Sequence, residues 1–233
     1  MARSVDLSVK IFVFLLVLLL APVLPAAGLD AVLANMDKAS SGFQSMQAGV
    51  RWVKYTALVD DETAEEGVIV VRRAKNKGVD LLIEFQKPYP YYLAIQGTKV
   101  EIYRPKIAEV QEYDLSKKRE MLDQALLLGF GTAGKFLSEN YNVKLIGEEQ
   151  AAGHDTVKLE LVPKSPEMLK NIPRIEMWIS KAGWQPVQQK MWQPAKGDYR
   201  LYTYTNIKQN PTLQDKAFQL KIPKGVKRVY PQR

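Results

Sequence analysis

The sequence contains no cysteine and a single histidine, His154, in 233 residues. Without cysteine the chain can form neither a disulfide nor a lipid-modified cysteine anchor, and it has no thiolate nucleophile. One histidine without cysteine also leaves too few ligands for a transition-metal site. The glycine-rich loops that cradle phosphate groups are missing as well. These absences predict that the protein uses neither a metal nor a cofactor.

Carboxylates are present in pairs, Glu148 with Glu149 and Glu160 with Glu176, and two carboxylates could serve a glycosidase. Nothing in their spacing distinguishes them from ordinary surface acids, so we assign no catalytic residue and do not expect an enzyme. The acidic run of residues 60–66 is expected to be a solvated turn, because adjacent carboxylates without fixed geometry seldom bind a metal.

The N-terminal segment has the order of an export signal. Arg3 and Lys10 precede the uncharged residues 11–28, which are rich in leucine, phenylalanine and valine and end in small residues. This order predicts a cleaved signal peptide over residues 1–28 and a periplasmic protein. Pro22 and Pro25 shorten the apolar run below the length of a good membrane span, although an uncleaved anchor is the alternative.

The rest of the chain, residues 29–233, shows no linker-like composition, and we expect a single domain. The formal net charge is +8, and it stays basic after loss of the leader. Because an exported protein seldom meets nucleic acid, we do not expect a nucleic-acid partner. The positive charge favours anionic lipid or an acidic protein instead.

Residues 68–105 carry the clearest strand pattern. From Val79 to Phe85 apolar residues occupy every second position, with Leu82 as the exception, and the strand that follows turns at residues 96–98. Such short connections join antiparallel neighbours. The same two-residue period recurs along the chain and predicts further strands at residues 43–58, 110–115, 143–146, 157–162, 174–180, 187–192, 200–207 and 217–222.

Helical spacing occurs in three places: at residues 29–36, at residues 117–128 and at residues 132–139. The fold class is therefore mainly β with α. About eleven antiparallel strands would curl into a barrel, with helices over one opening or one face.

The apolar face of this sheet can be a filled core or a lined cavity, and periodicity alone favours the filled core. The unusually apolar segment from Met121 to Phe130 must lie against an equally apolar surface, which favours a cavity with a lid.

Several short stretches of the chain stand out in a fixed order. They are residues 67–73, Leu81-Leu82-Ile83-Glu84-Phe85 with Pro88, residues 96–99 and 102–105, residues 159–164, Ile175-Glu176-Met177-Trp178-Ile179-Ser180 with Gly183 and Pro186, and residues 218–226. Together they resemble the periplasmic outer-membrane lipoprotein carrier family, LolA and its relatives.

The resemblance implies an incompletely closed antiparallel β-barrel with a helical lid and an N-terminal helix. It implies a monomeric carrier that takes acylated lipoproteins from an inner-membrane releasing transporter to an outer-membrane acceptor. The cavity would be lined by Leu81, Ile83, Phe85, Ile175, Met177 and Ile179. The lid would contain Met121, Leu126, Leu127 and Phe130. The arginine that holds the lid in the family precedes a proline, whereas the candidates here, Arg72 and Arg73, are followed by Ala74.

Two other functions stay open at this stage. Related folds serve as envelope sensors or scaffolds that act through a protein partner, and an uncleaved signal would favour that role. A carrier of envelope lipids other than lipoproteins would need the same apolar cavity.

Overall fold

A computed structural model of the protein describes residues 28–74, 78–116, 128 and 131–231. The helices and short 3₁₀ segments are α2 (Leu29–Ser41), η1 (Ala57–Val59), η2 (Pro105–Ile107), α4 (Gly134–Asn140), α5 (Pro166–Asn171) and η4 (Asp215–Phe218). The strands are β1 (Ser45–Thr56), β2 (Asp61–Arg73), β3 (Val79–Lys87), β4 (Tyr91–Gln96), β5 (Lys99–Arg104), β6 (Glu109–Asp114), β7 (Tyr141–Ala151), β8 (His154–Pro163), β9 (Ile175–Ser180), β10 (Pro186–Trp192), β11 (Tyr199–Gln209) and β12 (Lys227–Val229).

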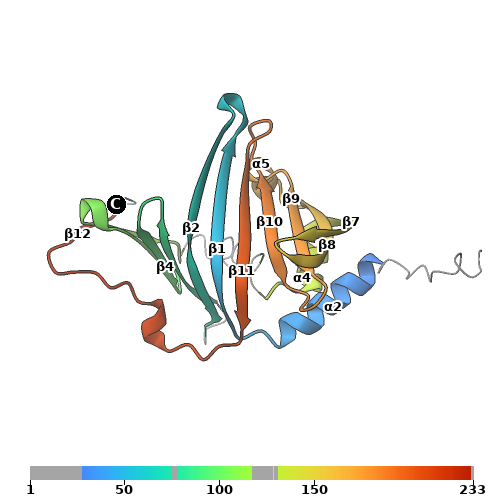
Figure 1. The fold of residues 1–233 in the computed structure, drawn as a ribbon, viewed down its shortest axis with the longest axis horizontal. Coiled ribbons are helices and arrows are strands. Elements are labelled where there is room, and N and C mark those ends of the chain that lie inside the picture. Colours follow the sequence, from blue (N-terminus) through green and yellow to red (C-terminus); the bar gives the residue numbers. More distant parts are fainter. Residues whose placement is uncertain (1–27, 75–77, 117–127, 129–130, 232–233) are drawn as a thin grey trace, which may run out of the picture.

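The described strands form one sheet of 12, in the order β12-β6-β5-β4-β3-β2-β1-β11-β10-β9-β8-β7. All neighbours are antiparallel except β12 and β6, which are parallel. The two edge strands, β12 and β7, lie at opposite sides of the molecule and do not pair (Figure 1). The predicted incompletely closed antiparallel architecture is confirmed.

The long β1–β2 hairpin differs from the prediction in one respect. The acidic residues 61–66 are not a turn but the first half of β2, and the register begins with Thr56 opposite Asp61. Arg51 on β1 lies 3.4 Å from Glu62 and 3.8 Å from Glu66 across the strand pair. Opposite charges on facing strands stabilise the extended conformation, so the run pairs instead of looping out.

The predicted strands of residues 79–103 are confirmed as β3, β4 and β5. Leu81 faces Ile95, and Ile83 faces Leu93. Gly97 closes the β4–β5 turn with a φ of 60°, a left-handed conformation that glycine adopts without a steric penalty.

The predicted strand at residues 217–222 is wrong. The segment forms η4 and then continues without regular structure until β12, which pairs with β6. Phe218 is fully buried, and η4 packs on β3 and β4. The segment thus covers the face of β3 that carries Leu82, which is 6% exposed. This cover explains why Leu82 breaks the alternation of its strand.

The helices α2 and α4 confirm two of the predicted helical segments, whereas most of the predicted helix at residues 117–128 lies outside the described residues. Helix α5 was not predicted, although Ser165 caps it and Pro166 begins it, a start signal that the sequence displays. None of the helices in the described ranges is long and apolar enough to cross a membrane.

Candidate functional site

The pairing register places one long apolar stripe on a single face of the sheet, here called the inner face, on which α2 and α4 also pack. In the β1–β6 half this face presents a cluster of buried side chains that includes no residue of a described helix. Its buried members are Met46, Ala48, Val50, Ile69, Val71, Val79, Leu81, Phe85, Ile95 and Val100, together with Tyr204 of the adjacent strand β11.

The six predicted cavity residues all lie on the inner face, but they divide between two clusters. Leu81 and Phe85 belong to the cluster of the β1–β6 half, and Ile83 is a half-buried neighbour of that cluster. Ile175, Met177 and Ile179 are fully buried in the β7–β10 half, in a second cluster that contains Val32 and Met36 of α2 and Leu137 of α4.

A buried glutamine lies between the two clusters. Gln189 on β10 is 2% exposed and donates a hydrogen bond from Nε2 to the carbonyl oxygen of Leu128 at 2.9 Å. Because a buried amide without partners costs free energy, this bond fixes Leu128 against the sheet. Leu128 is itself part of the second cluster.

Four aromatic rings cross the inner face in a row that the sequence analysis did not single out. Tyr202, Trp52, Phe85 and Tyr91 follow one another with ring centroids 5.7, 6.0 and 4.5 Å apart. We call this set the aromatic row. The Tyr91 hydroxyl donates to the Glu65 carboxylate at 2.6 Å. Burial and this bond raise the pKa of Tyr91, and burial raises the pKa of Tyr202, so both phenols stay neutral.

The aromatic row lies toward the end of the sheet at which β1, β3 and β5 finish. This end also carries a group of exposed apolar side chains on the connecting loops and on α5. They are Leu58, Val59, Tyr89, Ile107 and Leu169, of which Leu58 is 93% exposed. The loops at this end of the sheet therefore expose apolar side chains to solvent.

The two arginines predicted to hold a lid make different contacts. Arg72 lies on the outer face, 3.0 Å from Asp80 and 2.6 Å from Asp215, with its guanidinium 4.5 Å from the centre of the Phe218 ring. It therefore fastens the C-terminal segment to β2 and β3.

Arg73 contacts the N-terminal part of the chain. Its Nε donates to the carbonyl oxygen of Phe43 at 2.9 Å and its Nη2 to that of Ser40 at 3.2 Å. The Ser40 hydroxyl in turn donates to the carbonyl oxygen of Gly131 at 2.8 Å. Arg73 is thus linked through Ser40 to Gly131, the residue that follows the predicted lid segment. The lid residues Met121, Leu126, Leu127 and Phe130 lie outside the described residues.

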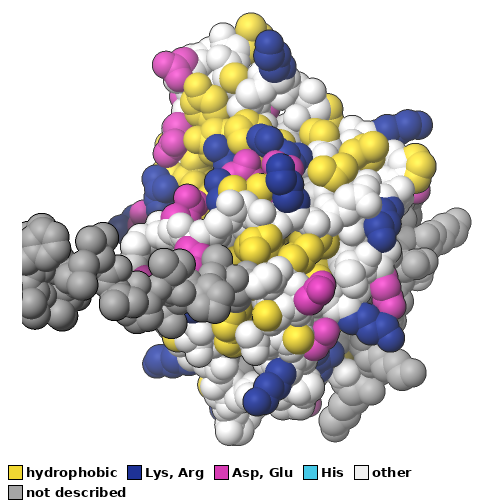
Figure 2. Space-filling view, turned by 90° about the vertical axis from the view of Figure 1, so that its right-hand side faces the viewer, with side chains coloured by type: hydrophobic (Ala, Val, Ile, Leu, Met, Phe, Trp, Pro, Cys, Tyr) yellow, Lys and Arg dark blue, Asp and Glu magenta, His cyan; other side chains and the backbone are white. Residues whose placement is uncertain are grey.

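The outer face of the β7–β10 half is polar and aromatic. Glu176 lies 2.9 Å from Lys158 and 3.4 Å from Arg174, and it accepts a hydrogen bond from Trp192 Nε1 at 2.9 Å. Although burial alone would raise it, the bonds from Lys158 and Trp192 hold the pKa of Glu176 below its usual value. The Glu160 and Glu176 pair thus belongs to an ion network. Figure 2 shows basic and acidic side chains interleaved in this way on the side of β7 and β8.

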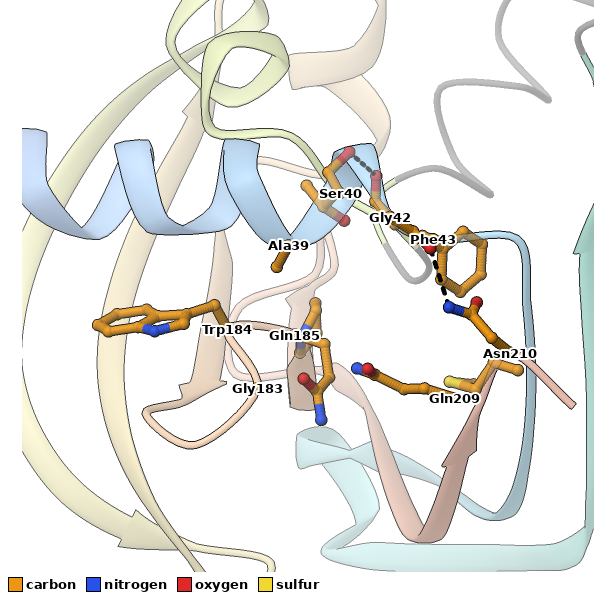
Figure 3. Close-up of a pocket in the computed structure, with 13 residues that line it drawn as sticks. Ala39, Ser40, Gly42, Phe43, Gly183, Trp184, Gln185, Gln209 and Asn210 are labelled. Carbon is orange, nitrogen blue, oxygen red and sulfur yellow. Dashed lines mark hydrogen bonds between the residues drawn. The ribbon is translucent and has the colours of Figure 1, made fainter.

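A pocket of about 160 Å³ opens where α2 ends, between the β9–β10 turn and the end of β11 (Figure 3). Gln185 and Gln209 extend toward one another across it, and Asn210 donates to the carbonyl oxygen of Gly42 at 2.9 Å. The pocket is small, and the described residues that line it supply amides, hydroxyls and apolar side chains such as Phe43, Met46 and Trp184, but no charged side chain. It can hold a few hydrogen-bonding atoms.

Comparisons with known proteins agree with this description at the level of the fold. A protein-family model described as an uncharacterized protein matches residues 82–221, which is more than half of the chain. A curated protein of Methanocaldococcus jannaschii, uncharacterized protein MJ0687, is 24% identical over 148 residues, or 61% of this chain and 41% of that protein. The chain therefore spans less than half the length of this relative.

Among solved structures, MucB is 13% identical with a TM-score of 0.54, over 84% of this chain and 64% of the MucB chain. An uncharacterized conserved protein from Thermus thermophilus is 16% identical with a TM-score of 0.53, over 86% of this chain and 98% of that one. A LolA superfamily protein from Nitrosomonas europaea is 14% identical with a TM-score of 0.40, over 84% of this chain and 98% of that one.

The open antiparallel sheet with helices on one face confirms the incompletely closed architecture that the sequence predicted, and MucB and the Thermus thermophilus protein share this fold. The chain belongs to the family of uncharacterized proteins whose model matches residues 82–221.

Proposed function

We propose that this protein is an exported lipid carrier in the periplasm. It holds the acyl chains of lipoproteins, or of related envelope lipids, on the inner face of the β1–β6 half and shuttles them from the inner to the outer membrane. The observation that supports the proposal is the apolar cluster around Leu81, Ile83 and Phe85, which contains no residue of a described helix. In this role the protein binds and releases its cargo and is not an enzyme.

Acyl chains suit such a surface energetically. Each methylene group moved out of water contributes about 0.8 kcal/mol to binding. Part of one acyl chain along β3 and β4 is therefore bound firmly without recognition of any particular chemical group. The exposed apolar loops around Leu58 and Ile107 lie at one end of the same face, and we place cargo exchange at that end. An inner-membrane transporter would load the carrier and an outer-membrane acceptor would unload it.

The test is mass spectrometry of the lipids that co-purify with the exported protein. We expect acylated lipid with the wild-type protein and none with Ile83→Glu, because a charge on the inner face opposes burial of a chain. Ile146→Glu is the matched control, since Ile146 is an exposed isoleucine on β7. The carrier proposal fails if the wild-type protein carries no lipid and binds no fluorescent fatty acid.

A second candidate is an envelope sensor or scaffold that acts through a protein partner. The outer face of the β7–β10 half favours it, because the half-buried Arg174, Lys190 and Trp192 form a surface with aromatic and cationic contact groups. If the exported protein co-purifies with a protein partner and carries no lipid, the result would support this candidate over the carrier.

A further inference from the structure

Two buried nitrogen atoms border the aromatic row, and neither has a hydrogen-bond partner among the described residues. They are Trp52 Nε1 on β1 and Arg104 Nη1 on β5. A buried donor without an acceptor lowers the stability of the fold, and a charged donor lowers it more. Proteins contain few buried donors without an acceptor, so each one needs an explanation. The simplest explanation is that a bound ligand supplies the acceptor.

Both donors lie beside the same two rings of the inner face. Trp52 contacts Phe85, with ring centroids 6.0 Å apart. Arg104 follows Tyr103, which pairs with Tyr92, so Arg104 neighbours Tyr91 across the β4–β5 ladder. Phe85 and Tyr91 are themselves stacked at 4.5 Å. The two donors therefore border one surface at the end of the sheet where β1, β3 and β5 finish.

The surroundings change from polar to apolar along the strands. At the level of the aromatic row stand Glu65, Tyr91 and Arg104, and Arg200 lies 5.8 Å from the centre of the Trp52 ring. Further along β3 and β4 the inner face carries Ile83 opposite Leu93, and then Leu81 opposite Ile95. One end of the surface thus offers hydrogen-bond donors, and the neighbouring positions of β3 and β4 offer hydrocarbon.

We propose that the aromatic row binds the phosphate-bearing headgroup of a diacyl lipid whose chains lie along Ile83 and Leu93. This inference rests on the proposed carrier function and names its ligand class. Arg104 Nη1 donates to a phosphate oxygen, a charge-assisted bond of the stronger kind. Trp52 Nε1 donates to an ester or phosphate oxygen.

The separation of the donors favours such a headgroup over a free fatty acid. Trp52 on β1 and Arg104 on β5 lie on either side of the stacked rings of Phe85 and Tyr91. A carboxylate has both of its oxygens on one carbon. A glycerophospholipid distributes acceptors over a phosphate and two ester groups, so it offers each donor an acceptor of its own.

The test uses Trp52→Phe and Arg104→Gln in the full exported protein, stripped of lipid. The probes are phosphatidylglycerol, diacylglycerol and a fatty acid with the same fluorescent acyl chain, and inorganic phosphate as a competitor. Each variant should lose about tenfold or more in affinity for phosphatidylglycerol, the loss expected for one strong hydrogen bond. Affinity for diacylglycerol should change much less, and inorganic phosphate should not displace the phospholipid, because it lacks the chains.

Matched controls come from the other face. Trp192→Phe and Arg174→Gln alter the same residue types on the outer face and should leave all three affinities unchanged. Trp52→Phe also removes part of the ring that stacks on Tyr202, so the melting temperature of each lipid-free variant is measured beside the affinities, and retained affinity for diacylglycerol separates lost headgroup binding from lost folding.

The outcomes also separate the two proposals. Equal losses for phosphatidylglycerol and diacylglycerol, or no loss for either, would refute the headgroup site and leave the carrier in place. Tighter binding of the fatty acid than of the phospholipid would refute it too. Absence of binding of every acylated probe by the wild-type protein would refute the carrier, and the headgroup site with it.

Discussion

The two halves of the sheet are covered on opposite faces. In the β7–β10 half, α2 and α4 pack on the inner face, and the outer face carries an ion network. In the β1–β6 half, the C-terminal segment covers the outer face through Phe218, and the apolar cluster of the inner face includes no described helix. The strands β3 and β9 have the same alternating pattern. On β9 it contributes to a core under α2 and α4, and on β3 it contributes to the candidate binding surface.

The largest expected effect is a difference in stability between the two halves. Met177→Glu places a carboxylate among fully buried side chains against α2 and α4, and we expect it to unfold the protein. Burial of an unpaired charge costs several kcal/mol, which approaches the whole free energy of unfolding of a typical domain. Ile83→Glu, on the half-buried surface of β3, should stay folded. Circular dichroism and urea unfolding measure both.

The opposite order of stabilities would contradict this difference between the two halves. If Ile83→Glu unfolds and Met177→Glu folds, then Ile83 belongs to the essential core and the binding surface lies in the other half. An equal loss of unfolding free energy in both variants would mean that the two clusters form one core.

A smaller effect is expected from the C-terminal segment. Phe218→Ala removes the fully buried ring that lies under Arg72, and a buried Phe→Ala change costs about 3–5 kcal/mol. The segment should then detach from β3 and β4 and become sensitive to limited proteolysis. Lys221→Ala, an exposed change on the same segment, is the control. Resistance of Phe218→Ala to protease would show that the outer face needs no such anchor.

The sequence predicted most strands because alternation is a local signal, as Val79 to Phe85 shows. It did not distinguish Ile83 from Met177, because both obey the same period and only the position of α2 separates them. The acidic start of β2 was missed since its charges are satisfied by Arg51 on the neighbouring strand. Phe218 was assigned to a strand although its burial comes from packing across β3 and β4.

The aromatic row could have been found in part from the sequence. Trp52 and Phe85 stand at apolar positions of their alternating strands, so their inner orientation was predictable. Their proximity depends on β2 lying between them, and Tyr202 joins the row only because β11 pairs with β1. Long-range pairing of this kind leaves no local signal. That the nitrogens of Trp52 and Arg104 lack acceptors in the described part of the chain can be recognised only in three dimensions.

The smallest expected effect concerns the outer face of the β7–β10 half. Because hydrogen bonds lower the pKa of Glu176 below the ordinary 4.5, its bonds stabilise the fold above that pH and are lost as the pH falls through the lowered value. Glu176→Gln should therefore destabilise the protein at pH 7 by about 1 kcal/mol, and the difference should shrink toward pH 3. Urea unfolding at both pH values measures it, with Glu160→Gln as a more exposed control. A difference that is constant with pH would mean that the Glu176 charge adds nothing. The outer face would then owe its order to its other contacts, among them the ion pair of Arg174 with Glu160 and the cation–π contacts of Trp178 and Trp192.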